Sequence, residues 1–282
     1  MRNQPEIIEE KITLPSEDEI PIWLTVWRPK ADHPLPLVVL LPGTKGFTRW
    51  GSFPYICERI AQTGKVVVGV DYSCSGVVDF GSDITRIDLV EKDSPLREVG
   101  DIKLSLDALC KPDWADKVNL SDVTLLGHSR GSGVAILITE NDKRISRLIL
   151  WAAVSRFNRY TSEQIEKWKE SGHHNVPNTR TGQDYFLGRR FLDEILSFSE
   201  SKLKDTLRFF ARPVLIIYGD KDTSVPTTES EELFVTVGPH LGKIVVIEGG
   251  DHTFGAKHPW AGTTPQLEEA ISSTIEWLNQ TK

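Results

Sequence analysis

Residues 122–137, DVTLLGHSRGSGVAIL, decide the fold of this chain. A strand-like apolar run precedes Ser129, a helix-like run follows it, and glycines stand two residues away on either side. This G-x-S-x-G pattern is typical of a sharp strand-to-helix turn that exposes a reactive hydroxyl. Larger side chains at Gly127 and Gly131 would collide with the adjoining strand and helix. The alternative is a tight turn that is only structural, but the buried strand before it and GSGVA after it favour the reactive serine.

The rest of the chain alternates apolar strand-like runs with helix-like runs. Eight runs are expected to be strands: 7–13, 20–27, 35–43, 65–72, 122–128, 146–154, 212–220 and 242–250. Helical spacing occurs at 52–64, 99–110, 130–139 and 264–280. Apolar strands that alternate with helices predict an α/β fold, with a mostly parallel eight-stranded sheet and helices on both faces.

Residues 155–211 interrupt this alternation. They are aromatic and charged, with helical segments around a turn-rich centre and no long buried strand. Because they stand between two core strands, we expect a small cap insertion over the carboxyl edge of the sheet, where such folds bind ligands. Its aromatic residues predict an apolar or aryl acyl pocket, although several must form the cap's own core: Phe157, Tyr160, Trp168, Tyr185 and Phe186. No linker divides the chain, so residues 1–282 are predicted to form a single domain.

The composition argues against several classes of function. The net charge of −7 disfavours a general binder of nucleic acid or anionic membranes. The start has no apolar core, so we expect neither a secretory signal nor a transit peptide, and no run approaches the roughly 18 apolar residues of a membrane helix. We expect a cytoplasmic protein with free, buried thiols at Cys57, Cys74 and Cys110, without metal or cofactor. The oligomeric state stays open.

A reactive serine needs a base, and His252 is the best placed of the seven histidines. It lies in EGGDHTFG, directly after the last core strand, and this loop returns to the sheet edge that carries Ser129. His128 adjoins the serine but is expected to point away from it. The other histidines are expected to be surface or substrate-contacting cap residues (His173 and His174) or solvated loop residues (His33, His240 and His258).

A carboxylate must hold the tautomer of this base. The segment YGDKDTSVP after the penultimate strand offers Asp220 and Asp222. We prefer Asp222, because a residue slightly past the strand end can turn toward the histidine loop, and we expect Asp220 to organise the turn. Asp251 is badly placed to bond the ring of its neighbour His252. The chain order serine, aspartate, histidine differs from trypsin-like and subtilisin-like proteases.

An oxyanion would need backbone N–H donors. One candidate is Arg130, which begins the helix after Ser129. The other is Thr44 in Gly43-Thr44-Lys45-Gly46, after the strand LVVLLPG, although PGTKG is open to interpretation as an ordinary turn.

These segments resemble the α/β-hydrolase superfamily over nearly the whole chain. LLPGTKGFTRWGSFPYICERIAQTGKVVVGVDYS resembles the opening of small serine hydrolases near the cinnamoyl/feruloyl esterases and the prolyl-oligopeptidase-like esterases, and GHSRGSG, GDKDTSVP and GGDHTFG resemble their catalytic segments. The insertion before Arg212 resembles the cap of cinnamoyl esterases. The chain departs from the pattern at Pro42, where histidine is common, and at Thr44, where an aromatic residue is common. Trp260 is expected near the pocket mouth or in a structural turn.

Residues and resemblance together predict a serine hydrolase that cleaves carboxylic esters through an acyl-enzyme. Ser129 would attack, His252 would move the proton and Asp222 would orient it. The N–H groups of Thr44 and Arg130 would bind the oxyanion. The expected partner is a small ester with an apolar or aryl acyl group. The alternatives are a peptidase or thioesterase with the same residues, or a non-catalytic binding protein of this fold.

Overall fold

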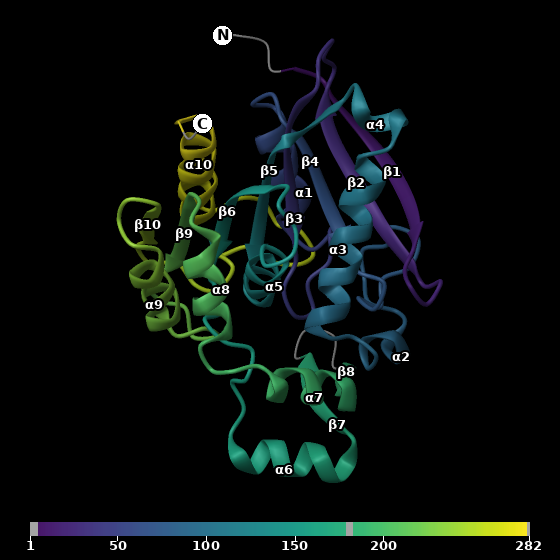
Figure 1. Cartoon of the computed structure of the whole chain (residues 1–282), viewed down its shortest axis with the longest axis vertical. Coiled ribbons are helices and arrows are strands. Elements are labelled where there is room, and N and C mark those ends of the chain that lie inside the picture. Colours follow the sequence, from purple (N-terminus) through teal and green to yellow (C-terminus); the bar gives the residue numbers. More distant parts are fainter. Residues whose placement is uncertain (1–4, 179–182, 281–282) are drawn as a thin grey trace.

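The computed structural model describes residues 5–178 and 183–280. Eight strands form one sheet in the order β1-β2-β4-β3-β5-β6-β9-β10. Their bounds are β1 (Ile7–Pro15), β2 (Pro21–Pro29), β3 (Leu35–Leu41), β4 (Val66–Asp71), β5 (Val118–His128), β6 (Ile145–Trp151), β9 (Val214–Gly219) and β10 (Gly242–Ile247). β2 is antiparallel to both of its neighbours, and the other pairs are parallel. The prediction of a mostly parallel eight-stranded sheet is confirmed (Figure 1).

Helices cover both faces of this sheet (Figure 1). On one face lie α3 (Pro95–Leu109), α5 (Arg130–Ile138), α8 (Lys202–Phe210) and α9 (Thr227–Val237); on the other lie α1 (Phe53–Ala61) and α10 (Pro265–Gln280). Consecutive residues of β5 show why the strands are apolar throughout. Leu125 packs with the first set of helices and Leu126 with the second, and both are fully buried. Alternate side chains of a strand point to opposite faces, so a sheet covered twice needs unbroken apolar strands.

The helix α3 begins earlier than its apolar spacing predicts. Ser94 is the N-cap, and its hydroxyl accepts from the N–H of Arg97, while Pro95 is the first helical residue. Serine before proline is a favourable helix start, so a signal for the earlier boundary was present in the sequence. Two further helices, α2 (Ile87–Val90) and α4 (Pro112–Ala115), are single turns.

Most of the chain between β6 and β9 forms a separate group of elements at one end of the molecule (Figure 1). It comprises α6 (Ser162–Ser171), β7 (His173–Asn178), β8 (Gln183–Gly188) and α7 (Arg189–Ser197). β7 and β8 pair as an antiparallel hairpin, which the sequence analysis did not predict. Part of the expected turn-rich centre, 179–182, lies outside the described residues. By contrast, α8 packs against α5 and α9 along the sheet.

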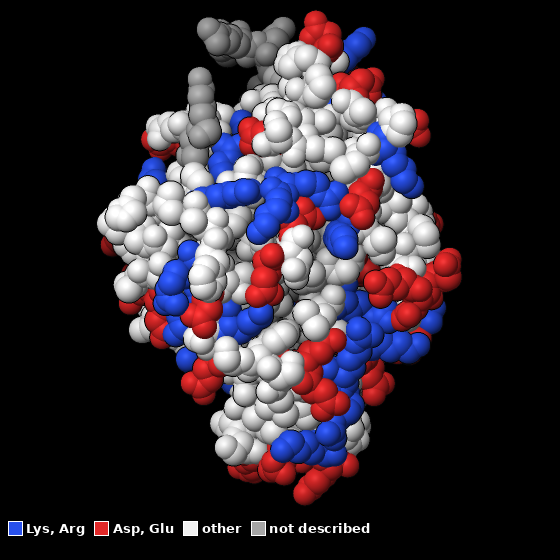
Figure 2. Space-filling model, viewed as in Figure 1, with Lys and Arg blue, Asp and Glu red and all other residues white. Residues whose placement is uncertain are grey.

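The surface and the thiols refine the expectations from composition. On the face drawn in Figure 2, Lys and Arg side chains are intermingled with Asp and Glu. Within the described ranges no helix has the length and apolarity to cross a membrane. Cys57 and Cys74 are buried, but Cys110 is exposed, so the expectation of three buried thiols is wrong. Cys110 follows the last turn of α3, where the helix leaves the core.

Candidate active site

The turn at Ser129 has the backbone strain that the glycine pattern predicts. Ser129 has φ 56° and ψ −123°, and its N–H donates to the carbonyl of Trp151 at 2.8 Å. A Cβ added to Gly127 would lie 2.5 Å from the carbonyl oxygen of Gly131, and one on Gly131 would lie 2.2 Å from that of Leu41. Side chains have no room at either glycine. A positive φ at a residue other than glycine is costly and persists where the surroundings enforce it.

His252 and Asp222 form a hydrogen-bonded pair beside this turn. The Nδ1 of His252 donates to Oδ2 of Asp222 at 2.7 Å. The other carboxylate oxygen accepts from the backbone N–H groups of Ser224 and Val225, at 2.8 and 2.9 Å. Burial by itself raises the pKa of Asp222, but the bonds from His252 and from these N–H groups outweigh it and hold the pKa below its ordinary value. A neutral ring that donates from Nδ1 keeps a lone pair on Nε2, the nitrogen that a general base uses.

Sheet topology explains why these two residues meet. They follow β9 and β10, which are parallel neighbours whose carboxyl ends lie at the same edge. The two loops are also tied directly: Oδ1 of Asp220 accepts from the N–H of Gly249 at 2.6 Å, and the N–H of Lys221 donates to the carbonyl of Gly250 at 2.9 Å. Asp220 therefore organises the turn, as predicted. Asp251 accepts from N–H groups of its own turn.

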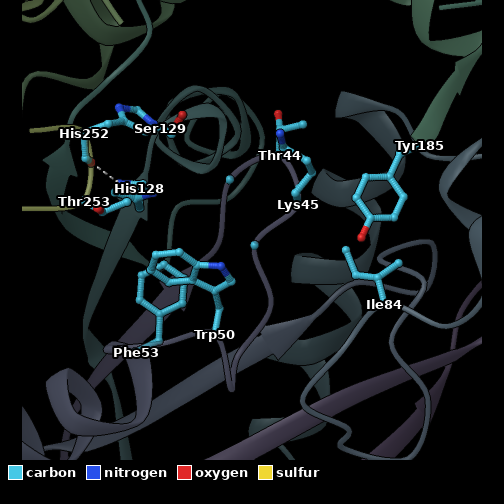
Figure 3. A pocket seen from close by; sticks show the side chains of 12 residues that line it. Thr44, Lys45, Trp50, Phe53, Ile84, His128, Ser129, Tyr185, His252 and Thr253 are labelled. Atoms are coloured by element: carbon cyan, nitrogen blue, oxygen red, sulfur yellow. Dashed lines mark hydrogen bonds between the residues drawn. The ribbon is translucent and has the colours of Figure 1, made fainter. Parts of the chain in front are cut away.

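Ser129 and His252 line one cavity of about 240 Å³ and lie at the same side of it (Figure 3). No hydrogen bond joins the serine hydroxyl to the imidazole in this structure. Such bonds are often long or absent without substrate and tighten when it binds, so their absence does not exclude a serine–histidine pair. Thr44 lines the same cavity, Asp222 lies behind the ring of His252, and Arg130 directly follows the serine.

His128 faces this cavity too, and it supports the histidine loop. Its Nε2 donates to the carbonyl of His252 at 2.8 Å, and the two ring centroids are 4.9 Å apart. Burial lowers the pKa of His128 to about 4, and electrostatic repulsion between the protonated ring and His252 adds to this effect. The ring of His128 is therefore neutral at physiological pH. Sequence reasoning gave His128 no such role.

The expectation that His258 is a solvated loop residue is wrong. Its Nδ1 accepts from the N–H of Gly51 at 2.9 Å, and its ring stacks on Trp50 with a centroid distance of 6.0 Å. The contact holds the loop after β10 against the loop after β3. In the segment between β6 and β9, His174 stacks on Trp168, whereas His173 is exposed.

The loop after β3 packs directly on the serine turn. A Cβ added to Gly43 would lie 2.7 Å from the carbonyl oxygen of His128, 2.9 Å from the Cβ of Ser129 and 3.2 Å from the backbone N of Arg130. Glycine at this position lets the loop that carries Thr44 pack closely against the backbone of Ser129 and Arg130. The N–H of Thr44 has no partner among the described residues, and the first N–H groups of a helix such as α5 have none within the helix.

Buried carboxyl groups hold this loop and the start of α5. Asp71, at the end of β4, accepts from the N–H of Thr48 at 2.6 Å. Burial raises the pKa of Asp71 to about 7, against the lowering effect of that bond. The guanidinium of Arg130 lies 2.6 Å from both Asp93 and Glu98. Burial raises the pKa values of these two carboxyl groups, although Arg130 opposes the rise.

The walls of the cavity are mostly apolar. Trp50 and Phe53 form one side, and Ile84 and Tyr185 lie across from Ser129 (Figure 3). Tyr185 comes from β8, so one of the aromatic residues of 155–211 reaches the cavity. The others pack elsewhere: Phe157 and Trp168 in the core, Tyr160 on Trp168, and Phe186 on His173.

One of two tryptophans near the cavity lines it, and the other does not. Trp260 stacks on Tyr55 at a centroid distance of 5.4 Å and does not line the cavity. Trp50, which the sequence analysis did not identify, lines the cavity instead. Its signal was a second large aromatic residue, after Phe47, in the short stretch FTRWGS that directly follows the predicted oxyanion loop. In the part of the chain that the structure describes, no group of His, Cys, Asp and Glu is arranged to hold a metal ion.

Comparisons with known proteins define the fold. No protein-family profile matches the sequence, and a search of curated proteins gives no match. Among solved structures, the chain is similar to DcsB in complex with its substrate analogue, with a TM-score of 0.75, 16% identity, and 98% of this chain and 100% of that chain covered.

Two further structures are similar over almost their whole length. Est1E from Butyrivibrio proteoclasticus has a TM-score of 0.69 and 17% identity, covering 96% of this chain and 98% of that one. The alpha/beta hydrolase GrgF from Penicillium sp. sh18 has a TM-score of 0.71 and 13% identity, covering 97% and 99%. The chain therefore has the α/β-hydrolase fold.

Proposed function

We propose that this protein is a serine hydrolase that cleaves carboxylic esters through an acyl-enzyme. The main support is the 2.7 Å bond from His252 to Asp222, which leaves Nε2 of the ring for the hydroxyl of Ser129 in the same cavity. A serine that only shaped a turn would not need an oriented imidazole beside it.

In the first half of the proposed reaction, the Oγ of Ser129 attacks the ester carbonyl carbon while its proton moves to Nε2 of His252. The negatively charged Asp222 stabilises the imidazolium. The N–H groups of Thr44 and Arg130 donate to the tetrahedral oxyanion. When the intermediate collapses, the C–O bond to the alcohol breaks and the alcohol leaves with the proton from Nε2.

In the second half, His252 takes a proton from a water molecule as that water attacks the acyl-enzyme. The second tetrahedral intermediate collapses, the acid leaves, and Ser129 recovers its proton. His128 is neutral and holds the His252 loop, so it does not compete for this proton. The apolar walls formed by Trp50, Phe53 and Ile84 favour a small substrate with an apolar or aryl group.

Hydrolysis of 4-nitrophenyl butyrate by the wild type and by Ser129→Ala tests the proposal. We expect the variant to lose at least about 10³-fold in kcat and to lose labelling by a fluorophosphonate probe. Equal rates would refute the proposal. A folded wild type that neither turns over esters nor reacts with the probe would instead favour a binding protein. Thioester and peptide substrates in the same assay test the thioesterase and peptidase alternatives.

A further inference from the structure

We propose that Lys45 determines specificity by binding a carboxylate, or a similar anion, carried by the substrate. This inference rests on the proposed ester hydrolysis and adds a substrate class to it: esters that bear a second, negatively charged group. Lys45 follows the proposed oxyanion donor Thr44 and lines the cavity that contains Ser129.

Among the described residues that line this cavity, Lys45 is the one with a permanent charge. The other lining residues are glycines, hydroxyl, aromatic and aliphatic residues, and the two histidines. The protein as a whole carries a net charge of −7, so a cation at this position is not part of a generally basic surface. A cation in a wall whose other described residues carry no permanent charge attracts anions to one place.

No Asp or Glu side chain neutralises Lys45. Every Asp and Glu of the sequence lies in the described ranges, and none forms an ion pair with Lys45. Three carboxyl groups around the loop and the hairpin already have partners. Asp93 and Glu98, in the smaller cavity on the other side of the loop, pair with Arg130. Asp184, opposite Pro177 in the hairpin, accepts from Asn175.

The contacts of the Lys45 ammonium fix its position and leave donors for a ligand. Nζ donates to the carbonyl of Pro177 in β7 at 3.2 Å, which places the ammonium between the loop after β3 and the hairpin. An ammonium has three N–H donors, so two remain. Loss of hydration lowers the pKa of Lys45, and a bound anion would replace the lost water. Tyr185 lines the same cavity from the neighbouring strand β8.

The experiment compares carboxylate esters with their carboxamide isosteres. On the acyl side, monomethyl glutarate is compared with methyl 4-carbamoylbutanoate; on the alcohol side, 4-acetoxybenzoate is compared with 4-acetoxybenzamide. For each enzyme the readout is the ratio of kcat/KM for the carboxylate to that for the carboxamide. Because both substrates meet the same enzyme, changes in folding or in the oxyanion loop cancel in the ratio.

We expect the wild type to prefer the carboxylate in at least one pair by about fivefold, the size typical of an exposed ion pair. The preference should disappear in Lys45→Met, which keeps an unbranched side chain but lacks the ammonium, persist in Lys45→Arg, and decline as NaCl is raised. If the wild type showed no preference in either pair, or if the preference survived in Lys45→Met, the inference would be overturned and the proposed function would stay intact. Loss of Ser129-dependent hydrolysis for all four esters and for 4-nitrophenyl butyrate would refute both.

Discussion

Replacing Gly43 by alanine tests the packing of the loop after β3 against the serine turn. The new Cβ would meet the carbonyl oxygen of His128 at 2.7 Å, the Cβ of Ser129 at 2.9 Å and the backbone N of Arg130 at 3.2 Å. All three atoms belong to, or are fixed by, the backbone, so no side-chain rotation relieves the overlap and the loop must move.

The substitution should lower both the stability of the protein and its kcat. Overpacking of this kind costs about 1–3 kcal/mol of stability. Moving the loop would also withdraw the N–H of Thr44 from the proposed oxyanion position, and the loss of one such donor lowers kcat by about 10²–10³-fold. Urea unfolding measures the first effect, and hydrolysis of 4-nitrophenyl butyrate measures the second.

Gly100→Ala is the matched control. A Cβ on Gly100, in the middle of α3, would meet nothing within 4 Å. Alanine is the better helix former, so this variant should be up to about 1 kcal/mol more stable, with unchanged kcat. If Gly43→Ala retained the kcat and the unfolding midpoint of the wild type, the close packing of loop and serine turn would be refuted.

Three further substitutions test other parts of the site. Asp222→Asn should lower kcat by about 10⁴-fold with little change in melting temperature, because the amide no longer holds His252 in the required tautomer; a loss below tenfold would contradict this role. Arg130→Met should lower the free energy of unfolding by about 3 kcal/mol, since it leaves Asp93 without its cation, and an unchanged urea midpoint would show that the pair is unimportant. The pKa of Asp71 is raised to about 7, so the folded protein keeps a proton that the unfolded chain releases near pH 4. The free energy of unfolding of the wild type should therefore fall as the pH rises from about 4 to 7, and this group should contribute up to about 4 kcal/mol of the fall. Asp71→Asn should lack that part of the pH dependence in urea unfolding, and an identical pH profile would refute it.

The succession of strands and helices along the chain and the class of fold followed from the sequence, because each depends on a local pattern. Buried strands need continuous apolar runs, and the turn at Ser129 needs glycine on both sides. The meeting of Asp222 with His252 was also predictable, since parallel neighbouring strands end at the same edge. For these features, residues close in sequence contain the physical cause.

The walls of the cavity depend on contacts between distant segments, and there the sequence was less informative. Ile84 and Tyr185 reach the cavity from a loop and from a hairpin whose position no periodicity reveals. His258 was expected to be solvated because it lies in a loop, yet its ring contacts Trp50, more than two hundred residues earlier. The sequence indicated no role for Lys45 beyond its place in a turn, because its lack of an acidic partner is visible only in three dimensions.

The adjacency of β6 and β9 has a consequence for how such chains diverge. Trp151, at the end of β6, pairs directly with Ile217 of β9, so the polypeptide departs from the sheet and rejoins it at the next strand over. Phe157, before α6, and Phe198, directly after α7, have ring centroids 5.8 Å apart, so the segment from α6 to α7 is an excursion with closely spaced ends. Replacing this segment by another one would remove Tyr185 and the contact of Lys45 with Pro177. The pairing of the strands that position Ser129, Asp222 and His252 would stay unchanged.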